Sequence, residues 1–147
     1  MAESRFLYVT YIRAPAEKVW EHLTSPELNK QFWSGFHQDS SWKVGDAYKI
    51  TSPDGRVYDE GKVLACEPPK RLSVSWKHLV DEAMKAEGES TATFELEPAG
   101  EGVTKLTLTH SIPVSPSKLV AAVAGGWPSI LSSLKSLLET GRALEIS

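Results

Sequence analysis

The C-terminal segment, residues 113–144, constrains the fold most, because it is typical of one long amphipathic helix that needs a partner surface. Ser115 and Pro116 predict its start, with a capping hydroxyl followed by proline at the first helical position. Gly141 predicts its end at a left-handed cap. Its apolar residues recur at the helical period: Trp127, Ile130, Leu131, Leu134, Leu137 and Leu138. Such a helix is stabilised mainly by packing its apolar face, so the rest of the chain should supply a surface for it.

Residues 125–128, Gly-Gly-Trp-Pro, interrupt this segment and predict that the helix is kinked or split there. Two roles are open for Trp127. It can mark a bend that admits a ligand, or it can anchor the start of a buried helix.

The N-terminal third predicts one strand and two short helices. Residues 5–12 alternate with β-branched and aromatic content on both faces, which indicates a strand covered on two sides or lying at a seam. A first helix follows Pro15, and Ser25-Pro26 predicts the start of a second. The second helix ends in an aromatic cluster that either caps the core or gates a pocket: Phe32, Trp33 and Phe36.

Regular turn chemistry between residues 36 and 112 predicts six further strands, joined mostly by hairpins and therefore antiparallel. Gly61 is a candidate bulge. Residues 79–89 are predicted to form a mobile loop or a helical turn through residues 81–86. The six strands are expected at residues 36–42, 46–52, 56–66, 71–78, 89–97 and 103–112.

Alternation in the last three of these strands predicts a sheet that is apolar on one face and wet on the other. The inward positions are Leu72, Val74, Trp76, His78, Ala92, Phe94, Leu96, Leu106, Leu108 and His110. The order strand, two helices, six strands, long helix predicts an α+β fold in which a curved seven-stranded antiparallel sheet packs on the C-terminal helix. With 147 residues, the chain (1–147) is expected to form one domain.

The composition narrows the possible partners. A net charge of −3, with basic and acidic residues interspersed, argues against nucleic acid. The longest nearly apolar run, residues 119–127, is too short for membrane insertion. The lone Cys66 allows no internal disulfide, is expected to be a small buried side chain, and fits a reducing, cytoplasmic setting. Nucleophile-elbow, phosphate-loop, dinucleotide and metal-binding motifs are missing, so no metal and no cofactor are expected.

Several short motifs, in order, resemble the START-like, helix-grip superfamily, and within it the family related to the activator of the heat-shock protein 90 ATPase. They lie at residues 12–20, 23–28, 32–33, 44–46, 54–55, 61–63, 68–72, 76 and 126–138. The resemblance implies a seven-stranded sheet around the last helix with a cavity between them. Members of the superfamily bind lipids, hormones or polyketides, and some are cyclases.

An apolar pocket between sheet and helix is the expected ligand site. His78 and His110 are predicted at the same end of their strands, facing the same volume. They can be half-solvated rim residues, contact a ligand, or serve in metal or acid–base chemistry. The full set of candidate ligand-binding residues is Phe32, Trp33, Phe36, Tyr48, Trp76, His78, Phe94, Leu108, His110, Trp127 and Leu131.

Four other polar residues are weaker candidates for the site. His22 and His37 are expected to be solvated. Asp59 and Glu60 can place a carboxylate near the pocket, although a solvent-facing position is the stronger expectation for them.

The leading hypothesis is a cytoplasmic protein that binds a small hydrophobic or amphipathic ligand and is not an enzyme. The alternatives are a polyketide cyclase- or dehydratase-like enzyme and a co-chaperone that stimulates the heat-shock protein 90 ATPase. A monomer or weak dimer is expected.

Overall fold

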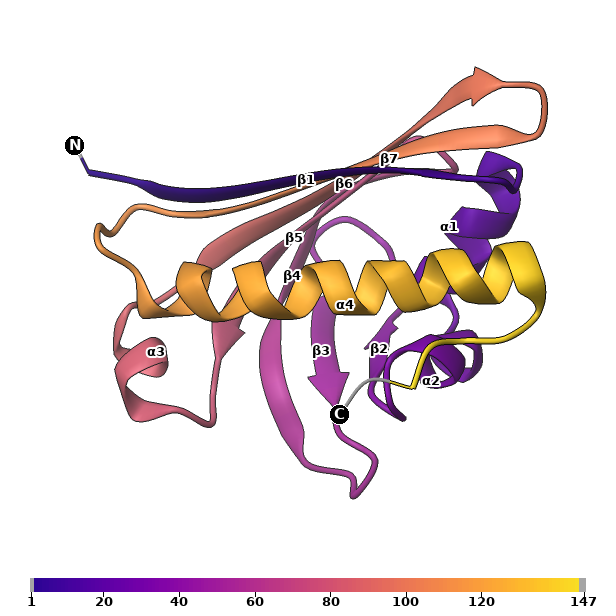
Figure 1. Ribbon diagram of the computed structural model, residues 1–147. Coiled ribbons are helices and arrows are strands. Elements are labelled where there is room, and N and C mark those ends of the chain that lie inside the picture. The colour runs from indigo at the N-terminus through magenta and orange to yellow at the C-terminus, as the bar shows by residue number, and fades with distance from the viewer. Residues whose placement is uncertain (1, 146–147) are drawn as a thin grey trace.

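A computed structural model describes residues 2–145, and these form a seven-stranded antiparallel sheet and four helices (Figure 1). The strands are β1 (Ser4–Ile12), β2 (His37–Ser40), β3 (Ala47–Thr51), β4 (Val57–Glu67), β5 (Arg71–His78), β6 (Ser90–Gly100) and β7 (Val103–Ile112). The helices are α1 (Ala16–Thr24), α2 (Pro26–Phe32), α3 (Glu82–Ala86) and α4 (Lys118–Thr140). The order across the sheet is β1-β7-β6-β5-β4-β3-β2, so every chain neighbour from β2 to β7 is also a neighbour in space.

Figure 1 shows α4 crossing in front of the sheet, and the core lies between them. The inward positions predicted for β6 and β7 are buried, and Leu131 and Leu134 of α4 are buried against them. On the opposite face, the hydroxyls of Ser73 on β5 and Thr93 on β6 form a hydrogen bond of 2.9 Å. The predicted helix-grip architecture is therefore confirmed.

The start of α4 and its predicted break differ from the sequence-based expectation. The helix is capped by Ser117, whose Oγ accepts from the Val120 amide at 3.0 Å, rather than by Ser115. It runs unbroken through Pro128, because the packing of Trp127 and its buried neighbours outweighs the poor helix propensity of residues 125–128. Its predicted end at Gly141 is confirmed, with φ of 82°.

Strand β1 is an edge strand with one half-buried and one exposed face, so of the two predicted arrangements the one with both faces covered is wrong. Phe6 and Tyr8 pack against the core. Leu7, Val9 and Tyr11 point the other way and are 60%, 43% and 52% exposed, because the structure places no second layer over this face in the described residues.

Gly61 is needed for a close approach between strands rather than for a bulge. A Cβ at this position would lie 1.8 Å from the Ser75 carbonyl oxygen on β5. The register irregularity between β4 and β5 falls later, between Val63 and Ala65.

Both ends of α4 are held by polar contacts from distant segments. At its start, the Glu87 carboxylate accepts from Ser117 Oγ and the Lys118 amide, each at 2.7 Å. Near its end, Lys135 Nζ donates to the Tyr11 carbonyl of β1 at 2.6 Å and to Glu139, which in turn accepts from the Arg13 amide.

No helix in the described residues is long and apolar enough to cross a membrane.

Candidate functional site

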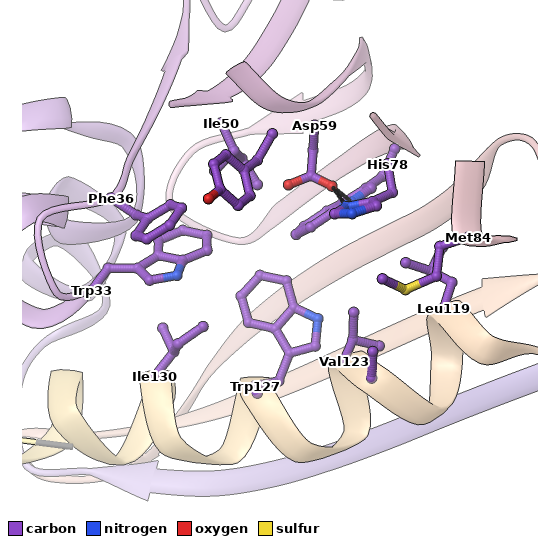
Figure 2. A pocket seen from close by; sticks show the side chains of 14 residues that line it. Trp33, Phe36, Ile50, Asp59, His78, Met84, Leu119, Val123, Trp127 and Ile130 are labelled. Carbon is purple, nitrogen blue, oxygen red and sulfur yellow. Dashed lines mark hydrogen bonds and ion pairs between the residues drawn. The ribbon is translucent and has the colours of Figure 1, made fainter. Parts of the chain in front are cut away.

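A pocket of about 320 Å³ lies between α4 and the strands β3, β4 and β5. Figure 2 shows Trp33 and Phe36 at one end, Met84 and Leu119 at the other, and Trp127 rising from α4 between them. Asp59 and His78 lie opposite α4. The complete lining is Trp33, Phe36, Ile50, Tyr58, Asp59, Trp76, His78, Met84, Leu119, Ala122, Val123, Gly126, Trp127 and Ile130. Such a lining is apolar, with few polar groups, as in most small-molecule sites.

The helix side of the pocket comes from the amphipathic pattern of α4. Leu119, Val123, Trp127 and Ile130 follow each other at spacings of four, four and three, which places them along one face. Gly126 also lines the pocket, and its missing side chain leaves open space beside Trp127.

The short helix α3 covers one end of the pocket through Met84. Its following residue, Glu87, attaches it to the start of α4 through the contacts described above. Burial acts to raise the pKa of the Glu87 carboxyl, but the hydrogen bonds from Ser117, Lys118 and Leu119 outweigh it, so the pKa is lowered. The charged form of Glu87 therefore holds α3 in place.

Asp59 and His78 form the polar centre of the pocket. They are directly opposed on β4 and β5, and Oδ1 of Asp59 lies 2.8 Å from Nδ1 of His78. The same oxygen accepts from Nε1 of Trp76 at 2.6 Å. Asp59 is 6% exposed, and burial raises the pKa of its carboxyl, against the opposing effect of the hydrogen bonds from His78 and Trp76.

The contacts of Asp59 define which nitrogen of His78 carries a proton. Two donors converge on Oδ1, as expected for an ionised carboxylate, so Nδ1 of His78 carries a hydrogen and donates it. Nε2 then holds a lone pair in the neutral ring. Within the described residues Nε2 makes no hydrogen bond, and it is not among the buried unpaired atoms. It therefore has some solvent exposure, on a side chain that lines the pocket.

His110 is a buried structural residue, and the prediction that it shares the pocket rim with His78 is wrong. Its exposure is 0%, and the ring of Trp76 lies 4.9 Å away, between centroids. Nδ1 accepts from Nε1 of Trp127 at 3.0 Å, and Nε2 donates to Ser90 Oγ at 2.8 Å. Ser90 Oγ donates onward to the Trp76 carbonyl. Burial lowers the pKa of His110 to about 4, so the ring is neutral and positions Trp127.

The eleven candidate residues divide into two groups. Five of the eleven line the pocket: Trp33, Phe36, Trp76, His78 and Trp127. The others lie outside the lining and are buried in the core: Phe32, Tyr48, Phe94, Leu108, His110 and Leu131. Alternation identified the inward face correctly, but it does not distinguish a side chain that packs against others from one that borders empty space.

Asp59 lines the pocket, although the stronger expectation from the sequence was a solvent-facing position. The usable signal was its spacing from Val63, which is 1% exposed: residues four apart on a strand share a face. Glu60 does face solvent, as expected.

The remaining histidines and the cysteine are placed as follows. His22 is 7% exposed and bonds the Lys18 carbonyl through Nδ1, so the expectation that it is solvated is wrong. His37 is largely buried and pairs with Asp39 through Nε2 at 3.0 Å, while its Nδ1 is buried without a partner in the described residues. Cys66 is half-buried. Residues 2–145 contain no cluster of three or more histidine, cysteine or acidic residues suited to a metal ion.

The curved sheet, the helix across it and the pocket between them define a START-like, helix-grip protein. The family model described as "Activator of Hsp90 ATPase homolog 1-like protein" matches residues 13–139. The chain belongs to this family. No protein of curated function matches the sequence.

Solved structures of similar proteins agree with this assignment. Protein MLL2253 from Mesorhizobium loti is 30% identical with a TM-score of 0.78, over 92% of this chain and 97% of that one. The Aha1 dimer from Colwellia psychrerythraea is 26% identical with a TM-score of 0.71, over 95% and 99%. DynU16, from the dynemicin biosynthetic locus, is 27% identical with a TM-score of 0.77, over 95% of this chain and 48% of that one.

Proposed function

We propose that this protein binds a small, largely apolar ligand in the pocket between α4 and the sheet, within the cytoplasm. The observation that carries the proposal is the pocket itself: about 320 Å³ of space bordered by aromatic and aliphatic side chains, with one polar pair inside. The origin of DynU16 in a biosynthetic locus for a natural product is consistent with a small-molecule ligand.

Adjacent glycines of α4 provide a matched test. Gly126 lines the pocket and Gly125 does not, and a Cβ at either position meets no atom within 4 Å. We expect Gly126→Leu to fill the pocket and Gly125→Leu to leave it open, while both keep the fold.

The assay titrates fatty acids, flavonoids and polyketide-like aromatics against tryptophan fluorescence, since Trp33, Trp76 and Trp127 all border the pocket. A compound that binds the unmodified protein and Gly125→Leu, but not Gly126→Leu, supports the proposal. Silence across the panel, or equal binding to both variants, contradicts it.

A second candidate function is stimulation of the heat-shock protein 90 ATPase, favoured by a specific surface feature. Leu7, Val9 and Tyr11 form an exposed apolar stripe along one face of β1, away from the pocket. Exposed apolar surface of this kind is typical of protein contacts. A direct ATPase assay with the unmodified protein and a Leu7→Ser, Val9→Ser double variant tests it: stimulation that the double variant loses supports this function, and no stimulation by the unmodified protein excludes it.

A further inference from the structure

The Asp59–His78 pair stands out because it places a buried carboxylate inside an otherwise apolar pocket. Burying a charge is unfavourable unless hydrogen bonds compensate it, and here Trp76 and His78 supply them. Both compensating bonds go to Oδ1 of Asp59. The arrangement leaves one ring nitrogen, Nε2 of His78, exposed and without a partner in the described residues, on a side chain that lines the pocket.

The chemistry of this nitrogen limits which ligand group it can bind. Asp59 holds the hydrogen of the neutral ring on Nδ1, so Nε2 accepts a hydrogen bond. The complementary ligand group is a donor. A ligand carboxylate is disfavoured, because it would lie near the Asp59 charge and no lysine or arginine lines the pocket. A weakly acidic hydroxyl, phenolic or enolic, is the donor that suits a neutral imidazole best.

The shape of the pocket limits the rest of the ligand. An apolar cavity of about 150 Å³ holds one benzene ring. About twice that volume is present here, which suits a bicyclic ring system. Trp33 and Trp76 lie at 5.5 Å and 5.4 Å from the Trp127 ring, between centroids, so they pack on it rather than forming a cage of open ring faces. This geometry favours a flat neutral ring over a quaternary ammonium group.

We propose that the pocket selects hydroxylated aromatic compounds, with the ligand hydroxyl donating to Nε2 of His78 while Asp59 fixes the accepting form of the ring. This inference rests on the proposed binding function and specifies its ligand class. Asp59 acts here as a positioning residue, since its carboxylate contacts His78 and Trp76 rather than the ligand.

Three probes of nearly the same shape separate hydrogen-bond donation from simple burial: 2-naphthol, 2-methoxynaphthalene and naphthalene. The methoxy compound accepts hydrogen bonds but cannot donate one. By calorimetry at neutral pH, the unmodified protein should bind 2-naphthol about tenfold more tightly than either other probe, as expected for one buried hydrogen bond.

Two variants test the two residues. His78→Leu should lose the preference for 2-naphthol while still binding naphthalene. Asp59→Leu removes the acceptor that holds the hydrogen on Nδ1, which allows Nε2 to carry the hydrogen, so most of the preference should disappear. The matched control is His37→Gln, from a second histidine–aspartate pair that does not line the pocket, and it should keep the full preference. Thermal melts confirm that each variant is folded.

The outcomes distinguish the two proposals. If the unmodified protein binds all three probes equally, or if the preference survives in both His78→Leu and Asp59→Leu, the assigned role of the pair is wrong while ligand binding stands. Tighter binding of 2-naphthylmethylammonium than of 2-naphthol overturns it in favour of a cationic ligand. If no probe binds the unmodified protein, the proposed function fails, and this inference fails with it.

Discussion

At the scale of single residues, Asp59 and His110 show that buried polar residues with similar partners can have different roles. Both are buried and both have their hydrogen-bonding groups engaged by tryptophan. His110 has a partner at each ring nitrogen, so it completes the core. His78, the partner of Asp59, lines the pocket and keeps one ring nitrogen without a partner in the described residues.

Replacing Asp59 by asparagine should leave stability unchanged or raise it by up to about 1 kcal/mol at neutral pH, because a desolvated charge is removed and an acceptor for Trp76 remains. Folding raises the pKa of Asp59, so the cost of its charge is present above the folded pKa and absent at pH values below the ordinary one. The gain should therefore vanish in acid. Urea unfolding of the unmodified protein and of Asp59→Asn, at neutral pH and in acid, measures this difference in stability. If Asp59→Asn lowers the free energy of unfolding by more than about 2 kcal/mol at neutral pH, the charge itself stabilises the fold.

His110 should make the protein sensitive to acid. Folding lowers its pKa from 6.5 to about 4, so its neutral form costs nothing at neutral pH, and stability falls as the pH drops through this range. The total loss from this residue is roughly 3 kcal/mol. Asp59 works in the opposite sense, so the comparison must isolate His110.

Urea unfolding of the unmodified protein and of His110→Gln, each at neutral pH and near pH 4, provides that isolation. The variant should be less stable at neutral pH by about 1–3 kcal/mol, because the Trp127 or Ser90 group loses its partner. It should lose less than the unmodified protein on acidification. Parallel losses in the two proteins would refute the assignment.

At the scale of secondary-structure elements, α4 has to pack on the sheet and also to leave space for the pocket. One face must be apolar to pack on the sheet, and Leu131 and Leu134 meet that need. The stretch around residues 125–128 has poor helix propensity, yet the helix continues through it. The space over Gly126 belongs to the pocket, which gives a reason for a small residue at that position.

Gly125 has no such reason, since it is exposed and does not line the pocket. We expect Gly125→Ala to raise the free energy of unfolding by about 1 kcal/mol, through the higher helix propensity of alanine. Gly126→Ala is the matched comparison: it should stabilise by a similar amount but weaken binding of any ligand that reaches α4. Thermal unfolding measures the first effect and titration the second. Destabilisation by Gly125→Ala would indicate strain that the open space around its Cβ does not reveal.

At the scale of the whole molecule, the architecture follows from the sequence more fully than the site does. The periodicity of α4 and the alternation in β5, β6 and β7 are repeated signals, so errors at single positions such as Ser115 leave the fold unchanged. The site depends on single contacts: whether Asp59 or Glu60 turns inward, and which histidine finds partners. The spacing of Asp59 from Val63 indicates the first, but the partners of the histidines lie up to 20 positions away in the chain, and no local pattern reports them.

The contact between Lys135 and the Tyr11 carbonyl, described above, has a consequence for how the protein behaves in concentrated solution. An edge strand has unpaired backbone N–H and C=O groups that can pair with a strand of another molecule. In this protein the exposed side chains of Leu7, Val9 and Tyr11 would favour such intermolecular pairing. Lys135 of α4 donates a hydrogen bond to the Tyr11 carbonyl, so this backbone group is no longer free to pair with another chain.

Lys135→Ala should therefore change stability by less than about 1 kcal/mol, as for other exposed ion pairs, but accelerate the formation of aggregates measured by light scattering. Lys30→Ala removes the same charge and a comparable ion pair, with Glu27, far from β1, and should scatter no more than the unmodified protein. Equal scattering by both variants would show that net charge, rather than a guarded strand edge, keeps the molecules apart. If the contrast holds, one helix both forms a wall of the pocket and protects the edge of the sheet from pairing with other molecules.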